Sequence, residues 1–185
     1  LEAFNRTIRK ETGVIQDPSS FPETFQGSRI SGAAQGSLRF ISSRNYFRQD
    51  GTRADAEFFS GIQEQMNLSA IPEEVPVRLA LVTSYTHQRI LPTDEELYSS
   101  MKSTDLDRLQ NSAYDIGTPL AVFHATRDGR WLYTITPLSE GWIKAEWKTT
   151  ENNRRAKFYA LTRFGRRELA TQAAAWDTLS SAITA

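Results

Sequence analysis

Residues 118–137, TPLAVFHATRDGRWLYTITP, contain two runs of alternating apolar and polar residues, separated by an Arg-Asp-Gly sequence at 127–129. Alternation with a period of two is typical of a strand with one buried face, and Asp-Gly between two such runs strongly favours a β-hairpin. Residues 77–81 show a similar alternation, and residues 141–149 predict another strand. Short strands separated by turns at this spacing favour a small β-barrel.

The first 76 residues predict a segment of helices and loops. Residues 1–13 have the spacing of a short amphipathic helix, whereas the Pro, Ser and Gly residues of 16–36 favour a loop anchored by Phe21 and Phe25. Residues 72–76, PEEVP, predict a linker. Residues 54–68 predict a helix whose apolar residues share one face: Phe58, Phe59, Ile62 and Met66.

The charges balance overall but not along the chain. The sequence has 22 basic and 22 acidic residues; residues 1–143 carry a net charge of −4, and residues 144–185 carry +4. A basic terminal segment is typical of contact with nucleic acid or an anionic surface. From charge alone, a solvated helix face is the preferred explanation.

Several kinds of site lack the residues they need. The chain has no cysteine, which excludes thiolate zinc sites, iron–sulfur clusters and a cysteine nucleophile within it, and its histidines are His87 and His124. We find no nucleophile, base and orienting group at a suitable spacing and no Gly-rich phosphate loop. We therefore predict no catalytic residues, no metal and no cofactor. No apolar run approaches the roughly 20 residues of a membrane span.

A known family matches several spaced elements of residues 82–145 together. These are Arg89 with Pro92-Thr93, Asp107 with Gln110, Gly117-Thr118-Pro119, His124 with Asp128-Gly129-x-Trp131, and Gly141-Trp142. The pattern resembles the bacterial SH3 (SH3b) domain that precedes the catalytic domain of NlpC-type peptidoglycan peptidases. The upstream sequence resembles the helical segment before this SH3 domain, so the resemblance covers residues 1–145.

The resemblance implies that this region has an accessory role and not a catalytic one. The catalytic cysteine and histidine of such enzymes lie on a separate domain, and the SH3 domain shapes the cleft that receives the stem peptide. We therefore expect noncatalytic binding of peptidoglycan or its stem peptide in the cell envelope, with a catalytic peptidase domain as a further partner. Candidate ligand contacts are Tyr85, His87, Arg89 and Trp131; alternatively, Tyr85 and Arg89 brace a loop against the barrel.

Residues 141–185 are very similar to a different family, the PadR-type transcription regulators. They resemble the wing hairpin of the winged helix and the helix that follows it. Arg154, Arg155 and Lys157, beside an Asn-Asn turn, are then placed to contact DNA phosphates. Residues 1–140 do not resemble the three-helix reader of that family. The alternative function is therefore DNA binding by a cytoplasmic regulator fragment, and either a fusion or a natural SH3-like protein with a basic hairpin explains the junction.

Together these patterns predict a mainly β fold with α-helices. We expect a helical and loop segment over residues 1–76, an SH3-like small β-barrel over residues 77–148, and a basic hairpin strand with a C-terminal helix over residues 149–185.

Overall fold

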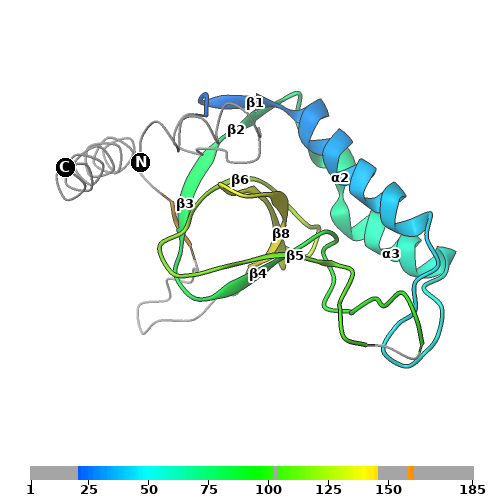
Figure 1. Cartoon of the computed structure of the whole chain (residues 1–185). Coiled ribbons are helices and arrows are strands. Elements are labelled where there is room, and N and C mark those ends of the chain that lie inside the picture. The colour runs from blue at the N-terminus through cyan, green and yellow to red at the C-terminus, as the bar shows by residue number, and fades with distance from the viewer. Residues whose placement is uncertain (1–20, 102–103, 146–157, 161–185) are drawn as a thin grey trace, which may run out of the picture.

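A strongly curved antiparallel sheet with two helices along one side forms the protein (Figure 1). The computed structural model describes residues 21–101, 104–145 and, for the backbone, 158–160. The helices predicted over residues 1–13 and 165–185 lie outside this range, as do Arg154, Arg155 and Lys157. The mainly β fold with helices before the barrel is confirmed.

The main sheet has seven strands in the order β5-β4-β8-β7-β6-β3-β9. Its strands are β3 (Arg78–Val82), β4 (Thr86–Arg89), β5 (Gln110–Tyr114), β6 (Pro119–Ala125), β7 (Trp131–Ile135), β8 (Glu140–Lys144) and β9 (Phe158–Ala160). The hairpin predicted from the Asp-Gly turn is confirmed, because β6 pairs antiparallel with β7. Gly129 in this turn has a φ of 68°, which a side chain would strain.

Strand β9 does not pair as the predicted wing requires. A wing hairpin would join the strand near residue 147 to the strand at 158–160. Instead β9 pairs with β3, with Val82 opposite Phe158 and Ala80 opposite Ala160. The neighbours of β8 are β4 and β7. Residues 158–160 form the predicted short strand, but it extends the barrel sheet at the β3 edge.

The loop predicted over residues 16–36 is wrong from Thr24 onward, because Thr24–Gln26 form strand β1 and a helix starts at Gly27. Helix α2 spans Gly27–Ser42, and helix α3 spans Ala56–Met66 as predicted, with a short 3-10 turn at Leu68–Ala70 after it. The apolar stripe of α2 is buried against the rest of the protein: Ile30, Ala34, Leu38 and Ile41. Burial of this stripe stabilises the helix despite its glycines, whose composition had suggested a loop.

The linker predicted over residues 72–76 is also wrong. Strand β2 (Glu74–Pro76) pairs antiparallel with β1 (Thr24–Gln26) in a separate two-stranded sheet. Pro76 lies at the end of a strand with one open edge, where a missing N–H breaks no ladder bond. This ribbon connects the helices to β3.

One hydrophobic core crosses the predicted boundary between residues 76 and 77. The same cluster contains residues of both helices and of barrel strands, including Met66, Leu79 and Trp142. Phe21 and Phe25 pack against it as predicted, and the Phe25 ring lies 5.3 Å from the Phe123 ring. The helices therefore share their core with the barrel.

Strand β3 is buried on both faces, whereas the alternation of apolar and polar residues at 77–81 predicts a single buried face. Val77 and Leu79 belong to the core shared with the helices, while Ala80 and Val82 belong to a second cluster within the sheet. Leu81, predicted to share the buried face, is half-buried. A strand packed on both sides needs apolar residues at consecutive positions.

Gly141 lies inside β8 and not in a turn. A Cβ on this glycine would lie 2.6 Å from the carbonyl oxygen of Arg89 on the neighbouring strand. Close approach of two strands, and not a turn, therefore requires a glycine here.

We predict that Gly141→Ala destabilises the protein by about 2 kcal/mol or more, because the added methyl group forces β4 and β8 apart. Gly36→Ala in α2 is the matched control, since its Cβ would meet no atom within 4 Å. It should stabilise the helix by up to about 1 kcal/mol. Urea unfolding measures both, and equal effects would contradict the close-approach explanation.

His124 connects the barrel to the helical segment. Its Nε2 lies 2.9 Å from the carbonyl oxygen of Met66, the last residue of α3. The backbone N–H of Arg127 donates to the carbonyl of Gln65 in the same helix. Burial lowers the pKa of His124 below its usual 6.5, although the hydrogen bond to Met66 opposes this shift.

A lowered histidine pKa means that the unfolded chain binds the proton more tightly than the folded protein does. Stability should therefore be full above pH 6.5 and decrease as the pH falls from about 6.5 toward 5. His124→Gln should remove most of this loss, whereas His87→Gln at an exposed position should retain it. Urea unfolding at pH 5 to 7.5 provides the measurement, and an unchanged slope in His124→Gln would refute the assignment.

Candidate functional site

A groove of about 340 Å³ opens where β4, β5, β7 and β8 meet the loop between β4 and β5. Tyr85, His87, Arg89 and Trp131 all line it. The structure thus brings together the four residues predicted as ligand contacts. The remaining lining residues come from the loop and the adjacent strands: Thr86, Asp94, Glu96, Gln110 and Lys144.

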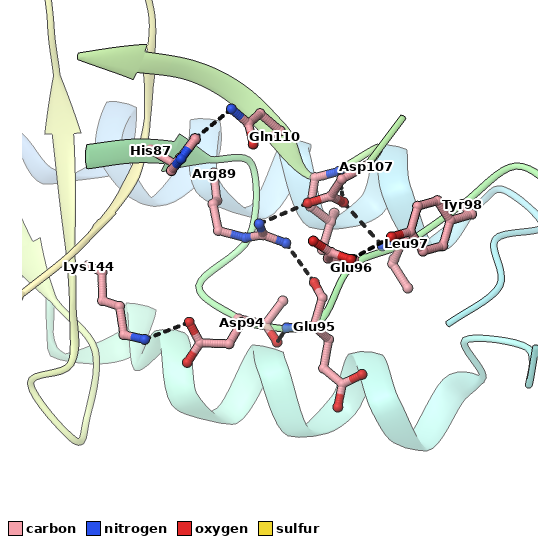
Figure 2. A network of polar contacts seen from close by, with 12 residues as sticks. His87, Arg89, Asp94, Glu95, Glu96, Leu97, Tyr98, Asp107, Gln110 and Lys144 are labelled. Atoms are coloured by element: carbon pink, nitrogen blue, oxygen red, sulfur yellow. Dashed lines mark hydrogen bonds and ion pairs between the residues drawn. The ribbon is translucent and has the colours of Figure 1, made fainter. Parts of the chain in front are cut away.

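An aromatic edge of the groove is formed by Tyr85 and His87. The Tyr85 side chain is 55% exposed, and its ring meets that of His87 at 90° with 5.1 Å between centroids. His87 Nδ1 lies 2.6 Å from Gln110 Nε2 on β5, which fixes the imidazole (Figure 2). Tyr85 lies in the short connection 83–85 between β3 and β4. An exposed ring held by its neighbours can pack on a ligand at little entropic cost.

Arg89 lines the groove but is largely buried. Its guanidinium pairs with Asp107 Oδ2 at 2.8 Å and donates to the Glu95 carbonyl at 2.6 Å (Figure 2). Asp107 Oδ1 also accepts the backbone N–H groups of Leu97 and Leu109. Arg89 therefore has the geometry of the loop-bracing alternative. Its Nε is buried without a hydrogen-bond partner in the described part of the chain.

The charged rim of the groove is mostly neutralised internally. Asp94 accepts from Lys144 at 2.8 Å and from Arg130 at 3.0 Å. The Tyr98 hydroxyl donates to Glu96, and this hydrogen bond raises the pKa of Tyr98 to about 12. Among the residues described, no cation forms an ion pair with Glu96, which is exposed. The rim therefore presents an acidic group beside the aromatic edge.

Trp131 belongs to the core more than to the surface. Its side chain is only 4% exposed, so it can offer a ligand no more than an edge at the groove floor. Trp142 is fully buried. Both positions agree with the expectation that these tryptophans are core or rim aromatics.

Sequence reasoning missed the polar side of the groove. Asp94, Glu96 and Lys144 carry no recognisable motif, and Gln110 was noted only as part of the resemblance. The loop that carries Asp94 and Glu96 meets Lys144 only in the folded barrel. Within the described ranges no group of His, Asp and Glu could hold a metal ion. Ser84 Oγ is buried without a hydrogen-bond partner there, so no Ser84–His87 bond forms.

Residues 97–144 match the model of the SH3 domain of the SH3b1 type. The match runs from the loop before β5 to the end of β8 and so contains Trp131, Gln110 and Lys144 of the groove. No curated protein matches the chain. The match supports the SH3b part of the predicted resemblance, while the PadR-type resemblance stays a prediction.

The backbone is also similar to a solved structure described as a novel NlpC/P60 endopeptidase from Photobacterium damselae subsp. piscicida. The TM-score is 0.60 at 18% identity, covering 78% of this chain and 36% of that chain. At this identity the likeness shows a shared fold. This chain spans about a third of the length of that endopeptidase.

We predict that Asp107→Ala destabilises the protein by about 3 kcal/mol or more, because it leaves Arg89 buried without its partner and frees two backbone N–H groups. Arg127→Ala is the control, since it breaks an exposed pair with Glu64. That change should cost less than about 1 kcal/mol. Urea unfolding separates the two effects, and a small loss in Asp107→Ala would show that the loop does not depend on the pair.

Proposed function

We propose that this chain is a noncatalytic accessory region of a cell-wall hydrolase and binds peptidoglycan through the groove beside Tyr85. The single observation that carries this proposal is the convergence of Tyr85, His87, Arg89 and Trp131 on one groove. The SH3b1 match and the NlpC/P60 structural likeness support the class of protein.

The chemistry of the groove suits the stem peptide of peptidoglycan. An extended peptide presents apolar faces to Tyr85, amide groups to Gln110, and charged termini or side chains to Glu96 and Lys144. Arg89, bound to Asp107 and to the Glu95 carbonyl, holds the loop that carries Glu96 against the groove. A small number of polar groups at fixed positions around an aromatic side chain orients the bound peptide, and we expect the affinity for it to be modest.

A role without catalysis follows from the residues available. The sequence has no cysteine, whereas NlpC-type peptidases of the resembled family use one as nucleophile. Cleavage would then belong to a catalytic peptidase domain acting beside this region.

Location in the cell envelope follows from this ligand. No helix of the described residues is long and apolar enough to cross a membrane. Access to peptidoglycan places the protein in the periplasm or outside the cell.

We predict that purified peptidoglycan sediments with the protein and that Tyr85→Ala lowers the bound fraction about fivefold or more, through loss of aromatic contact. Phe40→Ala is the matched control, because Phe40 on α2 is 54% exposed and lies outside the groove. Co-sedimentation with increasing amounts of peptidoglycan measures both variants.

Equal losses in Tyr85→Ala and Phe40→Ala would refute the groove as the binding site. A DNA shift at low and moderate salt, run in parallel, tests the alternative through Arg154, Arg155 and Lys157. Salt-sensitive DNA binding without peptidoglycan binding would overturn the proposal in favour of that alternative.

A further inference from the structure

A second groove lies between α2 and α3, away from the barrel groove. It consists of two adjoining parts of about 590 and 480 Å³, which share Gln35, Ser60 and Gln63. Helix α3 has 11 residues, so a groove along it extends roughly 16 Å. Both helices turn their apolar stripes into the core, which leaves polar side chains along the outer crease.

Neutral hydrogen-bonding groups line the middle of this groove. Among the described residues, the side chains of Gln35, Ser60 and Gln63 have no hydrogen-bond partner within the protein. A carboxamide and a hydroxyl both donate and accept, which matches the hydroxyl and acetamido groups of a sugar chain. The half-buried Leu68 adds an apolar contact at one end.

Cations frame the groove without making it strongly basic. Arg39 and Arg53 line one end, and the described ion pairs include neither of them. Asp55 beside them caps α3, accepting the N–H of Phe58 at 2.9 Å. Arg127 at the other end is paired with Glu64 at 2.9 Å. Arg53 also donates to Asn45 Oδ1, so its guanidinium keeps only part of its donors for a ligand. Arginine guanidinium groups bind carboxylates well, and Arg39 and Arg53 are therefore placed to contact an acidic group.

Two other classes of ligand fit less well. A polyphosphate chain requires a row of cations. Of the three arginines that line this groove, Arg127 is paired with Glu64, and the carboxylate of Asp55 lies beside the other two. A protein partner requires exposed apolar or aromatic anchors, but the large apolar residues at this site, Leu38 and Phe59, are buried.

We propose that the α2–α3 groove is a glycan site that binds a linear chain of N-acetylated hexosamines, with Gln35, Ser60 and Gln63 along the sugars and Arg39 and Arg53 toward acidic substituents. The site is separate from the barrel groove. It requires no peptide, so the protein would bind sugar chains and stem peptides on different surfaces.

Calorimetric titration with N-acetylglucosamine oligomers tests this site. Affinity should rise from the dimer and level off once the oligomer is longer than the groove, which extends roughly 16 Å. The double variant Gln35→Ala/Gln63→Ala should bind the hexamer about tenfold more weakly, because two hydrogen bonds are lost. Alanine is a good helix former, so both helices should persist, which circular dichroism verifies.

Gln65→Ala is the matched control. Gln65 has the same side chain on the same helix, but it lines a different groove. Its hexamer affinity should stay within twofold of the original protein. Failure of the hexamer to bind at millimolar concentration, or an equal loss in Gln65→Ala, would overturn the glycan site.

Tyr85→Ala separates this inference from the proposed function. If the sugars occupy the α2–α3 groove, this change lowers peptidoglycan sedimentation but leaves hexamer binding intact. Loss of hexamer binding in Tyr85→Ala, with no effect of the Gln35/Gln63 change, would place the sugars in the barrel groove and refute the second site.

Discussion

Arg89 and Asp107 form an ion pair whose two side chains are each only 11% exposed, and the loop between β4 and β5 is arranged around it. Arg89 is the last residue of β4, where the chain leaves the barrel. Asp107 lies where the chain returns toward β5. Removing either partner would leave a buried charge uncompensated, which costs far more than an exposed ion pair contributes. Asp107 also accepts hydrogen bonds from two backbone N–H groups. One carboxylate therefore both neutralises the buried Arg89 and holds the backbone of the loop in place.

The loop fixed in this way joins the helical segment to the barrel. Glu95 pairs with Arg48 at 2.9 Å, and the backbone of Tyr98 exchanges hydrogen bonds with that of Phe47, just after α2. On the other side, Asp94 binds Lys144 and Arg130 of the barrel. The loop therefore contacts both parts and carries the acidic rim of the barrel groove. Fold stability and the shape of the proposed binding surface depend on the same contacts.

The barrel groove and the α2–α3 groove are lined by different chemical groups, although the barrel and the helices share one hydrophobic core. The barrel groove combines an exposed aromatic edge with charged groups, whereas the α2–α3 groove offers amides, hydroxyls and two arginines. Peptidoglycan contains both peptides and sugar chains, so a protein with both grooves could hold the two components in a fixed relation. The shared hydrophobic core and the His124–Met66 contact would hold the two grooves at fixed positions relative to each other.

Local patterns determined much of the barrel. The Asp-Gly turn predicted the β6–β7 hairpin, the apolar face at 54–68 predicted α3, and spaced motifs indicated an SH3b domain and the residues of its groove. These signals are visible in the sequence because turn chemistry and side-chain periodicity act over a few residues.

Long-range contacts decided what local patterns could not. Helix α2 forms in a glycine-rich stretch because the core buries Ile30, Ala34, Leu38 and Ile41. Gly141 is required by the approach of Arg89 on another strand, and β9 pairs with β3, far away in the sequence. The acidic rim likewise depends on a loop tied to both parts of the protein. The sequence by itself determined the barrel hairpin, its Asp-Gly turn and helix α3. Tertiary packing decided where the polar groups meet, because burial and ion pairing join residues that no local pattern connects.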